Sequence, residues 1–288
     1  MVKNGNVLNT ISSLYQSLTK TEKKIADTIL MSPDLVVQCS LSEIAEHLDV
    51  GEATFVRFCR SVGFKGFSDF KLELSIELAT KDNLDNPLLE TDIEQADSSH
   101  HIAQKLQNAI SNVVSETINL LDLKQLEESV KAIRRANRIF LFGVGSSGIT
   151  AEEAKNKLMR IGFHVDATGN NHFMYMQAAL LKPNDVAIGI SHSGYSQETT
   201  HTLKIAKQNG ATTVAITHSL RSPITEAADF VLVNGNKQGK LQGDSIGTKI
   251  AQLFVLDLIY ALLVQSEQDR AVQTKQKTLN VILEQRIK

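Results

Sequence analysis

Residues 138–148 read RIFLFGVGSSG, and they carry the pattern that most clearly indicates the fold class. Its first five residues form an apolar run that is typical of a buried strand, and a helical pattern of apolar residues follows the glycines. The apolar run is nearly continuous rather than alternating, which favours a parallel strand covered on both faces. We therefore predict a strand, a glycine-rich turn and a helix within an α/β domain.

The same unit repeats on both sides of this stretch. Strands are expected at 138–142, 164–167, 185–190, 213–217 and 229–233, and helices at 102–121, 124–136, 149–161, 171–181, 196–209 and 245–264. Alternating strands and helices predict a Rossmann-like parallel sheet flanked by helices over residues 103–288. Residues 1–78 show only helical spacing, so we expect an all-α domain there. The polar, turn-rich residues 79–102 are expected to link the two domains.

Composition narrows the class of protein. The 288 residues carry a formal net charge of −2, so nucleic-acid binding needs a local basic feature rather than a global one. Cys39 and Cys59 lack the spacing of a disulfide or metal motif. The longest apolar stretch, 253–264, is interrupted by Asp257 and is short for a membrane span. We expect a cytoplasmic protein with no membrane partner, metal or cofactor.

Residues 40–71, SLSEIAEHLDVGEATFVRFCRSVGFKGFSDFK, predict a helix-turn-helix. Ser40 or Ser42 would cap the first helix, residues 49–51 would form the turn, and residues 52–62 would form the second helix. The second helix would face inward with Ala53, Val56, Phe58 and Cys59. The residues expected to face DNA are then Gly51, Glu52, Thr54, Phe55, Arg57, Arg60 and Lys65, with Ser61 and Lys71 nearby. A pair of helices that only pack together remains the alternative.

Two turns are candidates for binding a phosphorylated ligand. GVGSSG, residues 143–148, fits a dinucleotide-binding turn, and Asp166 lies close to where such a site needs an acid for the ribose. SHSGYSQET, residues 191–199, places three serines and a glycine at a second strand-to-helix turn. Hydroxyls and backbone N–H groups at a helix start form a binding site for a compact phosphate. A dinucleotide would not need this second phosphate-binding loop. Serines that merely cap the helix are the alternative.

Both blocks resemble one known family. Residues 41–74 resemble the N-terminal domain of the RpiR family of bacterial transcriptional regulators, with matching residues at Val50, Ala53, Thr54, Arg57, Phe58, Gly63, Phe64, Gly66, Phe67 and Lys71. Gly51 and Phe55 depart from the family's usual Ser and Val. ISHSGYSQET and GVGSSG resemble the two ligand loops of the SIS phosphosugar-binding domain. The two resemblances occur in the order expected for such a regulator.

The resemblance implies a ligand site and partners. We hypothesise contacts to sugar hydroxyls or to the partner subunit from Gln242, Asp244, Ser245 and Thr248. The resemblance itself implies that the sugar phosphate is bound by Ser146, Ser147, Ser191, Ser193, Gly194 and Ser196. It also implies a homodimer or homotetramer that binds a palindromic operator. Residues 243–263 resemble the subset that senses N-acetylmuramic acid 6-phosphate. We expect a repressor of amino-sugar catabolism genes that this type of effector releases from DNA.

A SIS-fold isomerase or etherase with a helical dimerisation domain is the runner-up. Such enzymes need a general base near the sugar carbons. The candidates are Asp244, His192, Glu198 and His218, and we interpret the last three as structural or loop residues. We therefore expect a sensor without turnover. An NAD-linked redox sensor that depends on Asp166 is the third alternative.

Overall fold

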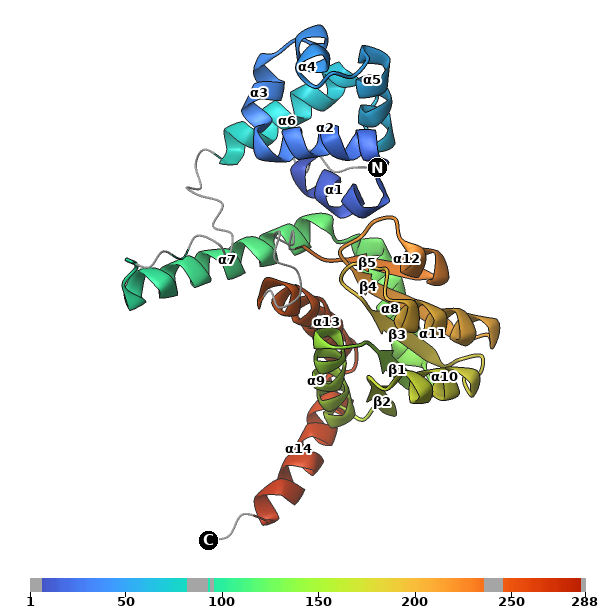
Figure 1. Ribbon diagram of the computed structural model, residues 1–288. Coiled ribbons are helices and arrows are strands. Elements are labelled where there is room, and N and C mark those ends of the chain that lie inside the picture. Colours follow the sequence, from blue (N-terminus) through green and yellow to red (C-terminus); the bar gives the residue numbers. More distant parts are fainter. Residues whose placement is uncertain (1–6, 82–92, 94–95, 236–245, 286–288) are drawn as a thin grey trace.

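The computed structural model describes residues 7–81, 93, 96–235 and 246–285, and it contains a helical domain and a sheet domain (Figure 1). The helical domain comprises α1 (Val7–Leu14), a 3-10 turn (Tyr15–Ser17), α2 (Lys20–Met31), α3 (Pro33–Gln38), α4 (Leu41–His47), α5 (Glu52–Ser61) and α6 (Phe67–Lys81). Capping boxes begin two of these helices, Thr19 with Glu22 at α2 and Ser40 with Glu43 at α4. The sequence predicted Ser40 or Ser42 as the N-cap of α4, and the structure shows that it is Ser40.

Aromatic rings hold the helical domain together. Phe55 and Phe58 on α5 have edge-to-face contacts with Phe67 and Phe70 on α6, and Phe64 from the connecting turn packs on Phe70. Edge-to-face pairs stabilise a core beyond the area that they bury. This packing fixes the rotation of α5 about its axis, and therefore decides which of its side chains face solvent.

The sheet domain contains five parallel strands in the order β2-β1-β3-β4-β5. The strands are β1 (Ile139–Phe142), β2 (Val165–Thr168), β3 (Val186–Ile190), β4 (Thr212–Thr217) and β5 (Phe230–Val233). The helices are α7 (Ser99–Leu120), α8 (Leu123–Arg135), α9 (Ser146–Arg160), α10 (Asn171–Ala179), α11 (Gln197–Gln208), α12 (Pro223–Ala227), α13 (Ile246–Ser266) and α14 (Gln268–Glu284). The predicted fold class is confirmed.

Helices cover both faces of the sheet, and strand β3 shows why. Its bulky residues Val186, Ile188 and Ile190 join a core shared with α8, α9 and α13. Ala187, on the opposite face, joins a second core shared with α10, α11 and α12. A Cβ on Gly189 would lie 2.7 Å from the side chain of Leu203, so the small residues let α11 pack close to the sheet.

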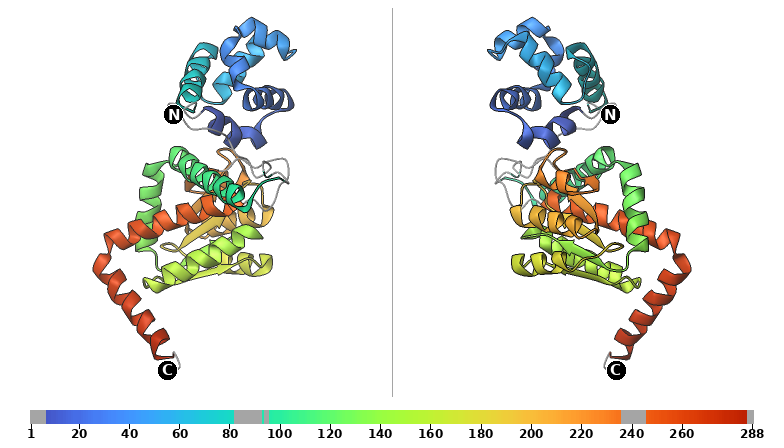
Figure 2. Two further views of the ribbon diagram at one scale, coloured as in Figure 1. Left: turned by 90° about the vertical axis from the view of Figure 1, so that its left-hand side faces the viewer. Right: turned by 90° about the vertical axis from the view of Figure 1, so that its right-hand side faces the viewer.

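Helix α13 is the one helix of the described residues that is long and apolar enough to cross a membrane by length and composition, over Gly247–Ser266. Its residues Val255, Ile259 and Leu263 are buried in the core beside α9 and the sheet. Its apolar character therefore follows from its position as a core helix. Helix α14 follows α13 and extends away from the sheet domain (Figure 2).

The domain boundaries predicted at 78 and 102 stay predictions. Helix α6 continues to Lys81, and helix α7 begins at Ser99 with Ser98 as its N-cap. The predicted linker therefore overlaps the ends of two helices by a few residues. Helix α1 is the part of the helical domain nearest to the sheet domain (Figure 1), and it packs against α7.

Candidate DNA-binding and effector sites

Helices α4 and α5 form the predicted helix-turn-helix. Asp49, in the turn, has a φ of 49°, and the N–H of Val50 donates to the Ala45 carbonyl at 3.0 Å. Ala45 is buried. Gly51 begins α5 in an extended conformation and has no side chain to cap the helix. The observed second helix ends at Ser61, one residue earlier than predicted.

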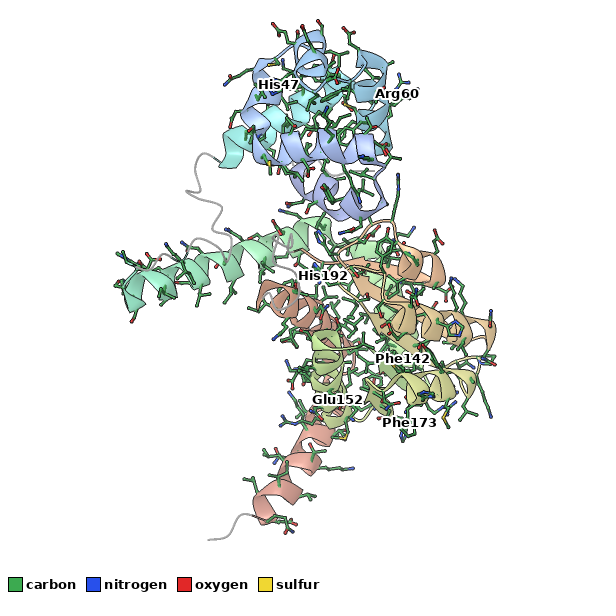
Figure 3. The ribbon with its side chains drawn as sticks, viewed as in Figure 1. His47, Arg60, Phe142, Glu152, Phe173 and His192 are labelled. Carbon is green, nitrogen blue, oxygen red and sulfur yellow. The ribbon has the colours of Figure 1, made fainter. Side chains whose placement is uncertain are left out.

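The exposed face of α5 carries most of the expected DNA contacts. Gly51, Glu52, Arg57, Arg60 and Lys65 are exposed, and Thr54 is half-buried. The Arg57 guanidinium donates to the Thr54 hydroxyl at 3.1 Å, and Arg60 Nε donates to the Lys65 carbonyl at 3.3 Å. Arg60 lies on the outer surface of the helical domain, away from the sheet domain (Figure 3). Two cationic side chains and a hydroxyl, those of Arg57, Arg60 and Thr54, thus lie on the face of α5 that we expect to contact DNA.

One predicted DNA contact is wrong. Phe55 is fully buried, whereas Ala53, which we expected to face inward, is exposed. The inward residues of α5 are 55, 58, 59 and 62, because Phe55 fits between Phe58 and Phe67. The departure from the family pattern at Phe55 is therefore a matter of packing.

Ser61 and Lys71 also have partners within the protein. The Ser61 hydroxyl donates to the Glu22 carboxylate at 3.1 Å, and the Lys71 ammonium donates to the Cys39 carbonyl at 2.7 Å. These bonds tie α5 to α2 and α6 to α3. Both side chains therefore have a structural role, which the sequence pattern did not reveal.

The strand order brings the two serine loops together. The first loop, Gly143–Gly148, follows β1, and the second loop, Ser191–Ser196, follows β3. These strands are neighbours, and between them the chain order reverses, so the two loops flank the topological switch point of the sheet. Open parallel sheets bind ligands in the crevice at this point, outside the carboxyl ends of the strands.

Each glycine of the first loop has a steric reason. A Cβ on Gly143 would lie 2.8 Å from the Ser147 carbonyl oxygen, and one on Gly148 would lie 2.9 Å from the Gly143 carbonyl oxygen. Gly145 has a φ of +58° and open space around it. The glycines thus bring the start of α9 against the end of β1.

Ser146 and Ser147 occupy the first turn of α9, where backbone N–H groups have no partner inside the helix. Both side chains are half-buried. The Ser147 hydroxyl also accepts a hydrogen bond of 3.0 Å from the Gln252 side chain on α13. Sequence reasoning missed Gln252 because a lone glutamine in an apolar helix has no motif.

The second loop precedes α11 in the same way. Gly194 has a φ of +74°, and Ser196 is the N-cap that accepts from the Thr199 N–H at 3.3 Å. The exposed Ser193 accepts from the Tyr195 N–H at 3.2 Å. Ser191 is buried at the end of β3. Three serines and the start of a twelve-residue helix therefore lie in one loop.

His192 of the second loop and His218, which follows β4, form a buried pair. The rings of His192 and His218 stack with centroids 5.2 Å apart, and both side chains are buried. Burial, and then the neighbouring His218, lowers the pKa of His192 to about 3. Burial also lowers the pKa of His218, whose Nδ1 lies 2.9 Å from the Asn234 carbonyl oxygen. Both rings are therefore neutral at pH 7.

The carboxylates near the loops are engaged. Asp166 accepts from Gln177 Nε2 at 2.8 Å and lies 3.6 Å from the Lys155 ammonium. Glu198 accepts from the Ser196 hydroxyl at 3.1 Å. These contacts agree with an ordinary strand-end role for Asp166. The predicted contacts Gln242, Asp244 and Ser245 lie outside the described residues.

A short segment after β4 connects the two domains. The N–H of Leu220 donates to the Ser13 carbonyl at 3.1 Å, and the Ser12 hydroxyl lies 3.5 Å from His218 Nε2. We call residues His218–Ser222 the bridging segment. It follows β4 at the edge of the sheet where both serine loops lie, and the labelled His192 lies at this end of the sheet domain (Figure 3).

The bridging segment also packs against the second loop. The His218 N–H donates to the His192 carbonyl at 3.0 Å. A Cβ added to Gly194 would lie 2.1 Å from the Ser222 hydroxyl oxygen, so the two segments touch at that glycine. One five-residue segment therefore contacts a helix of the helical domain on one side and a serine loop on the other.

A helix-turn-helix domain joined to a parallel-sheet domain with paired serine loops defines a transcriptional regulator with a ligand-binding domain. The comparisons agree: residues 5–81 match the helix-turn-helix domain of the rpiR family, and residues 132–262 match the SIS domain. The chain is 81% identical to an HTH-type transcriptional regulator of Haemophilus influenzae over 100% of both chains. It is 33% identical to another from Caldanaerobacter subterraneus, over 96% of this chain and 97% of that one. The protein belongs to the RpiR family of transcriptional regulators.

A solved structure resembles the whole chain. The NanR protein of Vibrio vulnificus, complexed with ManNAc-6P, has a TM-score of 0.63 and 25% sequence identity. The match covers 98% of this chain and 100% of that one. The likeness therefore extends over both domains.

Proposed function

We propose that this regulator represses genes of amino-sugar catabolism and that a sugar phosphate releases it from DNA. It acts in the cytoplasm as a homo-oligomer, and two helix-turn-helix domains bind the two halves of a palindromic operator. The sugar phosphate binds at the first and second loops through Ser146, Ser147, Ser191, Ser193, Gly194 and Ser196.

The position of the two loops carries this proposal. They flank the switch point between β1 and β3, and each leads into the N-terminus of a long helix. Backbone N–H groups and the helix dipole at such a terminus favour an anion, and the serine hydroxyls add donors. One loop suits the phosphate, and the other suits the phosphate or the sugar hydroxyls.

The effector class follows from this site and from a relative. The structural relative NanR is complexed with ManNAc-6P, an N-acetylated amino-sugar phosphate. Residues 243–263 resemble the subset that senses N-acetylmuramic acid 6-phosphate, which is also an N-acetylated amino-sugar phosphate. We therefore expect the effector to be a 6-phosphate of an N-acetylated amino sugar.

The domain acts as a sensor and not as an isomerase. Proton abstraction from a sugar carbon needs a base within hydrogen-bond reach of the substrate. His192 and His218 are buried against each other, and Glu198 accepts a bond from Ser196 in the loop itself. These arrangements favour structural roles for all three side chains.

The bridging segment provides a route from effector to DNA. It contacts His192 and Gly194 of the second loop and Ser13 of the helical domain. A ligand that reshapes the second loop would alter this contact and so the placement of the helical domain. The effector changes DNA affinity only as far as its own affinity differs between the two placements.

Binding to DNA tests the proposal. The DNA upstream of the gene that encodes the protein is labelled, and binding is followed by fluorescence anisotropy with and without each of three sugar phosphates. These are N-acetylmannosamine 6-phosphate, N-acetylmuramic acid 6-phosphate and glucosamine 6-phosphate. The expected result is specific binding that at least one of them weakens. Isomerisation of any of them by the pure protein, without specific DNA binding, would support the enzyme alternative and contradict the proposal.

A further inference from the structure

Gln252 is a buried polar residue on an otherwise apolar part of α13. Its side chain is fully buried, and its helix neighbours Ala251, Val255 and Leu256 are buried as well. An amide in such surroundings is unfavourable unless its polar atoms are hydrogen-bonded. Both ends of this amide have partners, and both partners belong to the start of α9.

The bonds of Gln252 have defined directions. Gln252 Nε2 donates to Ser147 Oγ at 3.0 Å. The Thr150 hydroxyl lies 2.9 Å from Gln252 Oε1 and 2.8 Å from the Ser147 carbonyl oxygen, and its single hydrogen is shared between these two acceptors. Thr150 is also buried. With both oxygens accepting from this hydroxyl, the Gln252 amide presents its N–H group to Ser147.

This orientation determines what the serine hydroxyl can do. A hydroxyl has one hydrogen to donate, and a donor aimed at its oxygen leaves that hydrogen free to point elsewhere. Ser147 is half-buried in the first loop, so its hydroxyl can reach a ligand in the crevice. A hydrogen directed there suits an anionic phosphate oxygen or a sugar oxygen.

We infer that Gln252 is a positioning residue that turns the Ser147 hydroxyl into a hydrogen-bond donor for the sugar phosphate. The inference rests on the proposed function, because it needs a ligand in the crevice. Gln252 is neutral and brings no negative charge behind the phosphate. A carboxylate at the same place would accept the serine hydrogen and would also repel the anion.

A double-mutant cycle separates positioning from support of the fold. Dissociation constants for N-acetylmannosamine 6-phosphate and for N-acetylmuramic acid 6-phosphate are measured by calorimetry for the wild type, Gln252→Met, Ser147→Ala and the double variant. We expect Gln252→Met to weaken binding roughly ten-fold, as for the loss of one hydrogen bond to a charged group. In the Ser147→Ala background the same change should have no further effect.

The variant Gln252→Glu gives a readout that a structural role would not produce. Its affinity relative to wild type should be lowest at high pH and should recover as pH falls, because a protonated carboxyl again donates to Ser147. Dividing the variant's affinity by the wild-type affinity at each pH cancels the effect of the ligand phosphate's own titration. The recovery should be absent in the variant that also carries Ser147→Ala. Melting temperatures without ligand check that each variant folds.

The outcomes separate the two claims. If the wild type binds and both Gln252 variants bind equally well, or if their losses are unchanged in the Ser147→Ala background, the inference is wrong and the proposed function stands. If the wild type binds neither sugar phosphate in the crevice, the proposed function fails and the inference fails with it. If the Gln252 variants lose affinity only when Ser147 is intact, the result supports both the inference and the proposed function.

Discussion

Individual serines in the two loops have different tasks, and their contacts distinguish them. Ser196 caps α11 and is bonded to Thr199 and Glu198, so it supports the loop whether or not a ligand is bound. Ser193 is exposed and bonds only locally, to the N–H of Tyr195. Capping and ligand binding are thus separable at the scale of single hydroxyls.

The first prediction compares these two serines. Ser193→Ala should weaken sugar-phosphate binding about ten-fold, because one bond to a charged group is lost, with little change in unliganded stability. Ser196→Ala should also lower the unfolding free energy by about 1 kcal/mol, because the helix loses its cap. Calorimetric titration and chemical unfolding measure the two quantities. Equal effects of both variants on stability would contradict this division of roles.

The second prediction concerns pH and the buried histidines. The pKa of His192 is lowered to about 3 by burial, so the unfolded chain binds a proton below pH 6.5 that the folded chain does not. Stability should therefore fall as pH drops below 6.5, by about 2 kcal/mol at pH 5 for this group. Urea unfolding at pH 7.5 and pH 5 measures the change. His192→Gln should reduce the pH dependence, and an unchanged dependence would show that other groups cause it.

At the scale of elements, the sequence predicted which helices and strands form but not how they are rotated or ordered. A cap at Ser40 could be predicted because an N-cap and the N–H group that it bonds are local in sequence. The burial of Phe55 was missed because it depends on Phe67 from another helix. Gln252 was missed for the same reason, since its partners are about a hundred residues away. Both features that the sequence did not reveal depend on tertiary contacts.

The third prediction belongs to helix α5. Arg57→Ala should weaken DNA binding and should reduce the slope of log affinity against log salt by about 1 if the guanidinium neutralises one phosphate. Arg135→Ala is the matched control, because Arg135 is an exposed arginine on α8 of the sheet domain. It should leave both quantities unchanged. Identical affinities for Arg57→Ala and wild type would remove this residue from the DNA interface.

For Phe55, which lies on the same helix, we expect an effect on stability rather than on DNA binding. Phe55→Ala should lower the unfolding free energy by about 3–5 kcal/mol, because it leaves a cavity among buried rings. Thermal unfolding followed by circular dichroism measures this loss. A folded variant of wild-type stability with weaker DNA binding would restore Phe55 as a contact residue.

At the scale of the whole molecule, the important feature is the bridging segment between the loops and the helical domain. The strand order that placed the two loops side by side also placed this segment, because it follows β4, the neighbour of β3. The sequence could not reveal the contact between Leu220 and Ser13, since it depends on how the domains meet. The family resemblance implied an effect of ligand on DNA but no route.

The fourth prediction tests this route. Ser12→Ala removes the hydroxyl that lies 3.5 Å from His218 Nε2 and should reduce the fold-change in DNA affinity that the sugar phosphate causes. Affinity for the sugar phosphate itself should stay within about two-fold of wild type, because Ser12 lies outside the loops. Thr28→Ala is the control, because Thr28 is a half-buried residue of α2 whose hydroxyl bonds only within its own helix, to the Lys24 carbonyl. An unchanged response to ligand in Ser12→Ala would argue against the route.

A thermal-shift measurement of the pure protein shows whether a sugar phosphate binds at the second loop. The protein is melted with the three sugar phosphates and with NADH, and the same series is run on Ser193→Ala. A ligand that binds only the folded state raises the melting temperature. We predict that an N-acetylated amino-sugar 6-phosphate raises it, that Ser193→Ala loses most of the rise, and that NADH has no effect. A rise with NADH alone, or a sugar-phosphate rise unchanged in Ser193→Ala, would contradict a phosphosugar site at the second loop.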